Sequence, residues 1–303
     1  MKEFKGGTAV ITGAANGIGR ALAKECARRG MNVVMADIDM GNLAQAEEEV
    51  RALGARTLAV RCDVTELDDW QALAKASIDT FGTVELLFSN AGVTALGDIV
   101  NIPEIDFDFC MQTNLYGTFY ALKTFVPILR AQRKPAHIGI TASAASIGTA
   151  PGMPAYYAAK HAVAGLCEPV YFDFLTWGDP IGMTILCPGM VKTSLNKCDT
   201  RRPEKFAIDW NNPYYTGLVY QSGQQATDND ISTGLEPEEV VDVFFKAIED
   251  DRLYALPGRV DGGLFEKRIA IARNEIRVDL MGWFGNFMKH DGKEREGSGD
   301  EGV

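Results

Sequence analysis

The chain has 303 residues, of which 46% are hydrophobic and 23% are charged, and its formal net charge at pH 7 is −11. This apolar content is that of an ordinary globular protein with one large core. The acidic balance, with basic clusters no longer than the pairs Arg28-Arg29 and Arg201-Arg202, excludes a protein that tracks the phosphate backbone of a nucleic acid.

Cysteines, histidines and apolar runs narrow the class further. The six cysteines form no CxxC pair and there are three histidines, so we expect reduced thiols and no metal site. The N-terminal MKEFKGGTAVITG leads directly into a strand and leaves no room for a signal peptide. No apolar run reaches the ~18 residues of a membrane span. We therefore expect a cytoplasmic protein with no membrane partner.

Over the first 190 residues, short apolar runs alternate with helical patterns. Strands are predicted at Thr8–Thr12, Asn32–Ala36, Thr57–Arg61, Val84–Ser89, His137–Thr141 and Met183–Cys187. Helices are predicted at Gly17–Arg29, Asn42–Leu53, Asp68–Phe81, Phe107–Arg130 and Ala155–Leu175. This alternation is typical of an α/β protein with a parallel sheet covered on both faces, and right-handed crossovers make it a doubly wound Rossmann sheet. We expect one domain over residues 1–260, with Leu253–Leu256 as its seventh strand.

A glycine cluster separates the first strand from the first helix. In Thr12-Gly-Ala-Ala-Asn-Gly-Ile-Gly19, Gly13 permits a sharp turn off the strand and Gly17 lets the backbone approach a pyrophosphate. Gly19 lets the helix pack closely on the sheet, with the positive end of its dipole facing the phosphates. This placement predicts a dinucleotide site.

Residues at later strand ends extend the predicted site. Asp37 ends the second strand, and a carboxylate there accepts both adenosine ribose hydroxyls and repels a 2′-phosphate. Because no Lys or Arg stands at position 38 or 39 or next to Gly17, NAD is favoured over NADP. The alternative is that Asp37 only forms a turn. Asp63 could lie beside the adenine amine, and Asn90-Ala91-Gly92 could bring backbone close to the adenosine ribose.

Four polar residues form a candidate catalytic set. Tyr156 and Lys160 share one face of a helix, and a lysine ammonium near a phenol lowers the phenol pKa toward the range useful for proton transfer. Ser143 follows a strand end, where its hydroxyl can bond a substrate carbonyl or alcohol. Asn114 lies inside a predicted helix, although asparagine is a poor helix former. Taken alone, the tyrosine and lysine could be a surface pair, and Asn114 could be a locally bonded or kinking residue.

The character of the sequence changes after Pro188-Gly189. Residues 190–235 are rich in Asn, Asp, Thr and Pro and carry the aromatics Phe206, Trp210, Tyr214, Tyr215 and Tyr220. Long irregular segments are often functional lids, so we expect the insertion 195–235 to contact an apolar substrate. The alternative is a surface insertion held down by its aromatics. A helix follows from Glu236 to about Ile248, then a helical extension over 261–291 and a tail, 292–303, that is too polar to order itself.

Together these motifs resemble the short-chain dehydrogenase/reductase family. The matching residues are Thr12-Gly-x-x-x-Gly-x-Gly19, Asp63, Asn90-Ala-Gly92, Asn114, Ser143, Tyr156-x-x-x-Lys160 and Pro188-Gly189. Their joint order and spacing, over roughly residues 5–195 and loosely to 260, make the match specific. Ser89 and Ala142, where the family often has Asn and Ser, remove no catalytic group. The insertion is also similar to that of Cα-dehydrogenases, which oxidise benzylic alcohols of lignin-derived aryl ethers.

The resemblance implies a role for each matching residue. Tyr156 would exchange the hydroxyl proton, and Ser143 would orient and polarise the reacting C–O. Lys160 would tune Tyr156 and hold the nicotinamide ribose, and Asn114 would support a water relay. The residues expected at the NAD cofactor are Gly13, Asn16, Gly17, Ile18, Gly19, Asp37, Asp63, Val64, Asn90, Ala91, Gly92, Tyr156, Lys160, Pro188, Gly189, Val191 and Thr193. Those expected at the substrate are Ser143, Tyr156, Met190, Phe206 and Trp210.

The implied activity is an NAD(H)-dependent interconversion of a secondary alcohol and a ketone, with an apolar or aryl-bearing substrate. The resemblance also implies a homodimer or homotetramer, because the long helices at about 104–131 and 155–175 pair between subunits in the family. An epimerase or dehydratase on the same fold stays open as an alternative. So does a non-catalytic NAD-binding module, although such a module has no need for Tyr156 and Lys160.

Overall fold

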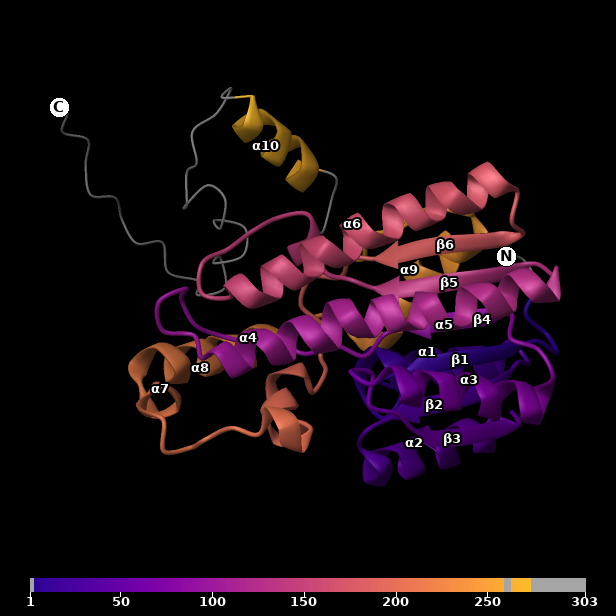
Figure 1. Ribbon diagram of the computed structural model, residues 1–303, viewed down its shortest axis with the longest axis horizontal. Helices are drawn as coiled ribbons and strands as arrows, with labels where there is room; N and C mark the ends of the chain where they lie inside the picture. The colour runs from indigo at the N-terminus through magenta and orange to yellow at the C-terminus, as the bar shows by residue number, and fades with distance from the viewer. Residues whose placement is uncertain (1–2, 259–262, 274–303) are drawn as a thin grey trace. The chain divides into compact units, whose positions relative to one another are not determined.

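The computed structural model describes residues 3–258 and 263–273 of the chain (Figure 1). The chain divides into two compact units, residues 1–261 and 262–303. In the second unit the described part is helix α10 (Gly263–Ala272) and Arg273. The rest of the expected helical extension to residue 291, and the polar tail 292–303, lie outside the described residues.

The first unit is built on one sheet of seven parallel strands. These are β1 (Thr8–Thr12), β2 (Asn32–Asp37), β3 (Thr57–Arg61), β4 (Leu86–Ser89), β5 (Ala136–Thr141), β6 (Ile181–Leu186) and β7 (Tyr254–Ala255). Their order across the sheet is β3-β2-β1-β4-β5-β6-β7. The direction of winding reverses between β1 and β4, which places a crevice at their carboxyl ends. The prediction of a doubly wound Rossmann sheet is confirmed.

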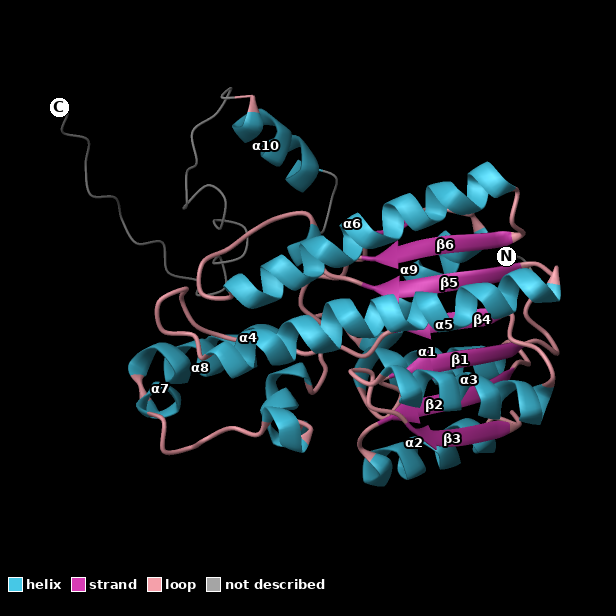
Figure 2. Ribbon diagram, viewed as in Figure 1, coloured by secondary structure: helices cyan, strands magenta, loops and turns pink. Residues whose placement is uncertain are grey.

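Helices cover both faces of this sheet. Figure 2 shows α3, α5 and α6 in front of the strands and α1, α2 and α9 behind them. The bounds of the long helices are α1 (Gly17–Arg28), α2 (Met40–Ala52), α3 (Leu67–Phe81), α4 (Glu104–Met111), α5 (Gly117–Gln132), α6 (Pro154–Trp177) and α9 (Pro237–Glu249). With both faces covered, a central strand can be buried along its whole length, as β1 is.

Local signals explain where several of these helices begin and end. Helix α9 starts with a capping box, in which the Glu236 and Glu239 side chains each accept a backbone N–H of the first turn. Helix α6 has Pro154 at its first position, where a missing N–H costs nothing. It ends at Gly178, whose φ of 66° is the left-handed conformation that glycine adopts readily.

The helix predicted over Phe107–Arg130 is not one regular helix. Helix α4 runs into a π-helical turn, η1 (Gln112–Tyr116), and then into α5. Asn114 lies at the centre of η1. Single π-turns inside α-helices are frequent at functional sites. The poor helix former therefore marks a real irregularity in the helix.

The insertion is not the irregular segment that the sequence predicted. It contains two 3-10 turns, η3 (Leu195–Arg201) and η4 (Glu204–Phe206), and two helices, α7 (Pro213–Thr216) and α8 (Leu218–Ser232). Its ends are joined by a parallel bridge between Val191 and Leu235. Figures 1 and 2 show α7 and α8 beside α4, on the side toward which the strand arrows point. The insertion thus lies at the carboxyl edge of the sheet.

Candidate functional site

The loop between β1 and α1 has glycines where a side chain would block a ligand from approaching the backbone. Gly13 has φ 66°, and a Cβ added there would lie 2.9 Å from the Ala91 Cα. A Cβ at Gly19 would lie 2.0 Å from the Gly13 carbonyl oxygen, so the turn admits only glycine. The Asn16 side chain does not cap α1, which leaves the positive end of this helix to other acceptors. These features fit the phosphates of a dinucleotide.

Asp37 ends β2 beside this loop. Its carboxylate accepts the backbone N–H of Ala15 and of Asp39, each at 3.0 Å. Burial raises the pKa of Asp37, and the two hydrogen bonds and the charge of Arg201 oppose that shift. Asp37 therefore both shapes the glycine loop and presents a carboxylate at the strand end. The predicted position is as expected, and Arg201 is an addition that the sequence did not reveal.

Asn90 joins three strand ends. Its Nδ2 donates to the Thr12 carbonyl oxygen at 2.9 Å, and its Oδ1 accepts the Thr141 hydroxyl at 2.9 Å. It therefore fixes the ends of β1, β4 and β5 relative to one another. Asp63, after β3, is buried and accepts both the N–H and the hydroxyl of Thr65. Val64, which follows it, is also buried.

Asn114 is held by its whole amide group. Its Nδ2 donates to the carbonyl oxygens of Val93 and Cys110, each at 2.9 Å, and its Oδ1 accepts the Val93 N–H at 3.2 Å. The side chain is 1% exposed. A Cβ added at Gly92 would lie 2.9 Å from Asn114 Oδ1 and 3.4 Å from Lys160 Nζ. Gly92 thus marks the place where these two candidate residues converge.

Tyr156 and Ser143 meet from opposite sides of the site. Tyr156 lies in the first turns of α6, and Ser143 caps the short 3-10 turn η2 (Ala144–Ser146) by accepting the Ala145 N–H at 3.1 Å. The Ser143 hydroxyl is near enough to Tyr156 to oppose the rise in the pKa of the phenol. The Tyr156 ring packs against an apolar cluster that includes Ala95 and Cys110. The phenol therefore faces a hydroxyl in largely apolar surroundings.

Lys160 is one helical turn beyond Tyr156 and is almost fully buried. Its Nζ donates to the Thr141 carbonyl oxygen at 2.9 Å, and it lies 5.8 Å from the centre of the Tyr156 ring. The hydroxyl of Ser146 donates to the Lys160 carbonyl oxygen at 2.8 Å. Lys160 is therefore anchored at the end of β5, between Tyr156 and Asn114.

The pKa of Tyr156 differs from what the sequence suggested. We expected the Lys160 ammonium to lower it, but burial raises it, and the hydrogen bond with Ser143 only opposes that shift. Burial also lowers the pKa of Lys160 to about 8. Tyr156 as a residue is half-buried, and the loss of water around its hydroxyl explains the shift in its pKa. The phenol therefore keeps its proton at neutral pH.

The segment after β6 returns to the glycine loop. The Pro188 carbonyl oxygen accepts the Ala144 N–H at 2.8 Å, which fixes the start of the segment beside Ser143. A Cβ added at Gly17 would lie 2.8 Å from Thr193 Cγ2. Thr193 thus lies against the glycine loop. Val191 is buried, whereas Met190 is 42% exposed.

The aromatics expected at the substrate have different surroundings. Phe206 is 7% exposed, with its ring centre 5.4 Å from that of Phe109 on α4. Trp210 is 60% exposed and contacts Tyr215 at 5.6 Å. Neither ring contact involves Tyr156. Phe206 is thus a packing residue between the insertion and α4, and Trp210 is an exposed side chain on the insertion.

A buried ionic cluster holds the insertion on α4. Arg202 Nη1 donates to Asp106 Oδ1 at 2.6 Å, and its Nη2 donates to Asp199 Oδ1 at 2.5 Å. Tyr215 donates to Asp106 at 2.8 Å, and Tyr220 donates to Asp199 at 2.6 Å. The Arg202 side chain is 3% exposed. Arg202 therefore clamps the insertion to α4.

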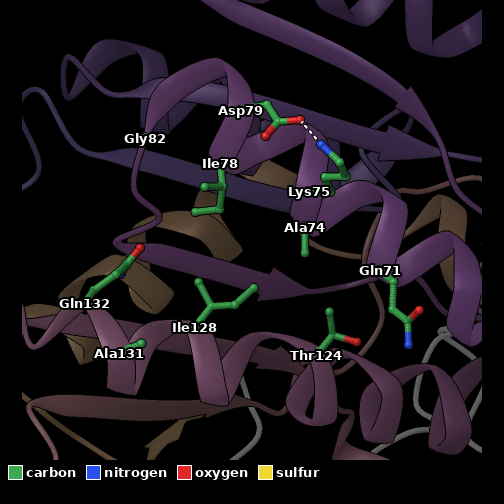
Figure 3. Close-up of a pocket in the computed structure, with 10 residues that line it drawn as sticks. All are labelled: Gln71, Ala74, Lys75, Ile78, Asp79, Gly82, Thr124, Ile128, Ala131 and Gln132. Carbon is green, nitrogen blue, oxygen red and sulfur yellow. Dashed lines mark hydrogen bonds and ion pairs between the residues drawn. The ribbon is translucent and has the colours of Figure 1, made fainter.

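One further surface feature lies away from these residues. Figure 3 shows an open groove between α3 and α5, lined by residues that include Lys75, Ile78 and Ile128 and none of the candidate site residues. In the described part of the chain, no group of three or more His, Cys, Asp or Glu side chains is arranged to hold a metal ion. No helix within the same residues has both the length and the apolar character needed to cross a bilayer.

Known proteins resemble this chain in fold and in sequence. The family model described as short chain dehydrogenase matches residues 7–204. The chain is 35% identical to "CLA biosynthesis dehydrogenase/reductase" of Lactiplantibacillus plantarum, over 89% of this chain and 94% of that protein. It is 31% identical to "C alpha-dehydrogenase" of Sphingobium sp., over 85% and 82% of the two chains.

A solved structure agrees with these relatives. The short chain dehydrogenase/reductase from Burkholderia phymatum, crystallised in complex with NAD, superposes with a TM-score of 0.86 at 34% identity, covering 92% of this chain and 99% of that one. The family model spans well over half of the sequence, and both the relatives and the structure extend the match beyond it. The chain belongs to the short-chain dehydrogenase family.

Proposed function

We propose that the protein is an NAD-dependent dehydrogenase that interconverts a secondary alcohol and a ketone. The observation that carries the proposal is the convergence of Tyr156, Ser143, Lys160 and Asn114 at the carboxyl edge of the sheet. The Ser143 hydroxyl is near enough to Tyr156 to influence its pKa, and Lys160 and Asn114 both border Gly92. A module that only binds a dinucleotide needs none of these four groups.

The glycine loop, Asp37 and Thr193 are the residues that would hold the cofactor. Gly13, Gly17 and Gly19 leave the backbone bare where phosphates would lie. The Asp37 carboxylate would accept hydroxyls of the adenosine ribose. When bound, NAD supplies the acceptor for the hydride that leaves the alcohol carbon. The relative crystallised with NAD supports this choice of cofactor.

The remaining chemistry is a proton transfer by the chain's own residues. Ser143 would hydrogen bond the substrate oxygen and hold it beside the Tyr156 hydroxyl. In ketone reduction the phenol donates its proton to that oxygen, which suits a pKa raised by burial. In alcohol oxidation the phenolate must accept the proton, so a higher pH should favour this direction. Lys160 and Asn114 would hold the proton path behind Tyr156.

The apolar surroundings of Tyr156 support an apolar substrate. Ala95, Cys110, Ala155 and Ala159 are buried in one cluster, and the Tyr156 ring packs on it. Such a wall would receive an alkyl or aryl group and offers few hydrogen bonds. The relatives named as C alpha-dehydrogenase and as a dehydrogenase/reductase are consistent with a carbinol or carbonyl centre.

The test is a panel of aryl and alkyl secondary alcohols incubated with NAD and the purified full-length chain. We expect NADH absorbance to rise in step with ketone, one molecule of each per turnover, with aryl or long alkyl alcohols favoured. An epimerase or dehydratase would convert its substrate with no net NADH. If no alcohol or ketone in the panel changes the NADH absorbance, the proposed reaction is wrong.

A further inference from the structure

Four cationic side chains lie in residues 194–206, the first part of the insertion. Three of them are either paired with a carboxylate or exposed to solvent. Arg202 is paired with Asp106 and Asp199 inside the protein. Lys205 forms an ion pair with Glu66. Lys197 is exposed to solvent. Arg201 is the fourth, and it is neither paired with a carboxylate within 4.0 Å in the described residues nor fully exposed.

Arg201 is held in place all the same. Its Nη1 donates to the Ser194 hydroxyl at 3.0 Å, and its Nη2 donates to the Ser194 carbonyl oxygen at 2.6 Å. A guanidinium has five N–H donors, so these bonds fix its orientation and leave donors free. A long side chain loses rotamer freedom in such an arrangement, which suggests that its charge has a use at this position.

The guanidinium lies beside the candidate cofactor site. Ser194 follows Thr193, which contacts the position of Gly17 in the glycine loop. The charge of Arg201 opposes the rise that burial causes in the pKa of Asp37, and it contributes to the lowered pKa of Asp39, just after the end of β2. Arg201 is therefore bonded to the residue that follows Thr193, beside the loop where phosphates would lie, and its charge reaches the strand end where the adenosine ribose would lie.

We propose that Arg201 binds a phosphate group of the dinucleotide and positions the cofactor from the insertion side. This rests on the proposed function, because it assumes that a dinucleotide occupies the glycine loop. Planar guanidinium groups bind phosphate oxygens in pairs and form hydrogen bonds about twice as strong as neutral ones. The phosphate is either the pyrophosphate bridge common to NAD and NADP or the 2′-phosphate of NADP. Asp37 repels the second of these, and the pyrophosphate is the better partner.

The test measures binding by calorimetry on the full chain, with NAD, NADP, ADP-ribose and adenosine as probes. Arg201→Gln should weaken NAD and ADP-ribose at least about tenfold, which is about 1.4 kcal/mol, and leave adenosine unchanged. Arg201→Lys should recover part of the loss. Lys197→Gln, which removes an exposed cation from the same segment, should change each Kd less than about twofold, as isolated surface charges do.

The outcomes separate the two phosphates and the two proposals. A loss confined to NADP would assign Arg201 to the 2′-phosphate. Suppose that the wild type binds NAD or NADP and that Arg201→Gln binds both with unchanged affinity. That result would overturn the role of Arg201 and leave the proposed function standing. A wild type that binds no dinucleotide would overturn both. Unchanged adenosine affinity in Arg201→Gln would show that its fold around the site is intact.

Discussion

At the scale of single residues, burial sets the charges around the candidate site. Lys160 is 4% exposed and its pKa falls to about 8 because the ammonium has lost water. The one carbonyl that it contacts, that of Thr141, stabilises the charge less than water does. The sequence could predict the pairing of Tyr156 and Lys160 from their spacing. It could not predict the shift, because the depth of burial depends on helices far apart in the chain.

Lys160 should make stability depend on pH. Below pH 8 the folded protein holds a buried ammonium, at a cost of about 3 kcal/mol relative to the unfolded chain. The unfolded lysine keeps its proton up to about pH 10.5, so between these values the folded state binds fewer protons and stability rises with pH. Lys160→Met should therefore raise Tm at pH 7, with a smaller gain near pH 10. Lys197→Met is the matched control, and an equal loss of Tm for Lys160→Met at both pH values would contradict the argument.

Asp37 should decide between the two dinucleotides. Its carboxylate would accept ribose hydroxyls from NAD and repel the 2′-phosphate of NADP. Asp37→Asn removes the negative charge and keeps only one of the two side-chain oxygens that accept the N–H groups of Ala15 and Asp39. We expect it to weaken NAD binding about tenfold, the loss expected for a charge-assisted hydrogen bond, and to narrow the preference over NADP. The comparison is made on Kd values of both cofactors, and a wild type that binds NADP as tightly as NAD would refute this role.

At the scale of elements, the strands were predictable and the insertion was not. The central strands are short runs of mostly apolar residues, and their bounds differ from the predicted ones by at most two residues. Val84, a predicted strand residue, lies outside β4, and the Gln132 side chain bonds both its backbone N–H and its carbonyl. No local pattern could reveal a partner 48 residues away.

Helix α8 shows why the insertion resisted prediction. Its sequence, LVYQSGQQATDNDIS, is rich in residues with modest helix propensity. What stabilises it is packing, since Tyr220 and Ile231 are buried and a Cβ at Gly223 would lie 3.4 Å from Leu96. The loop around Leu96 is more than a hundred residues earlier. Tertiary contacts thus override a weak local preference.

The Arg202 cluster should hold the insertion closed over the site. Removing Arg202 leaves the Asp106 and Asp199 carboxylates buried without a cation, which typically costs about 3–5 kcal/mol. Arg202→Met should therefore increase hydrogen exchange across 195–232 and raise KM for bulky alcohols more than for small ones. The control Lys205→Met breaks the exposed pair with Glu66 and should cost less than about 1 kcal/mol. Unchanged exchange in Arg202→Met would show that the cluster does not hold the segment.

At the scale of the whole molecule, the outer surface of α5 and α6 is unusually apolar. The exposed large side chains there are Tyr116, Phe119, Phe172, Leu175 and Trp177. Phe172, Leu175 and Trp177 are 57%, 60% and 75% exposed within six residues of α6, and large apolar side chains exposed close together are typical of protein contacts. These are the helices that pair between subunits in the family, and the sequence predicted the bounds of α6 within two residues.

We predict that the protein is a homodimer or homotetramer through this surface. Phe172→Glu combined with Leu175→Glu should place charges in the interface and halve the mass measured by light scattering, because unpaired buried charges are costly. Leu53→Glu, an exposed leucine at the end of α2, is the control and should keep the wild-type mass. A wild type that is monomeric at micromolar concentration would contradict the assignment.

The central claim is that Tyr156 moves the proton in an NAD-dependent alcohol–ketone conversion. The most direct measurement compares wild type and Tyr156→Phe for both kcat, from NADH absorbance with an accepted alcohol, and Kd for NAD, from calorimetry. The account predicts that the variant keeps NAD affinity within about twofold and loses at least about 99% of kcat, since positioned general acids contribute roughly 10²–10⁴-fold. A variant that retains more than about a tenth of kcat, with NAD still bound, would contradict it.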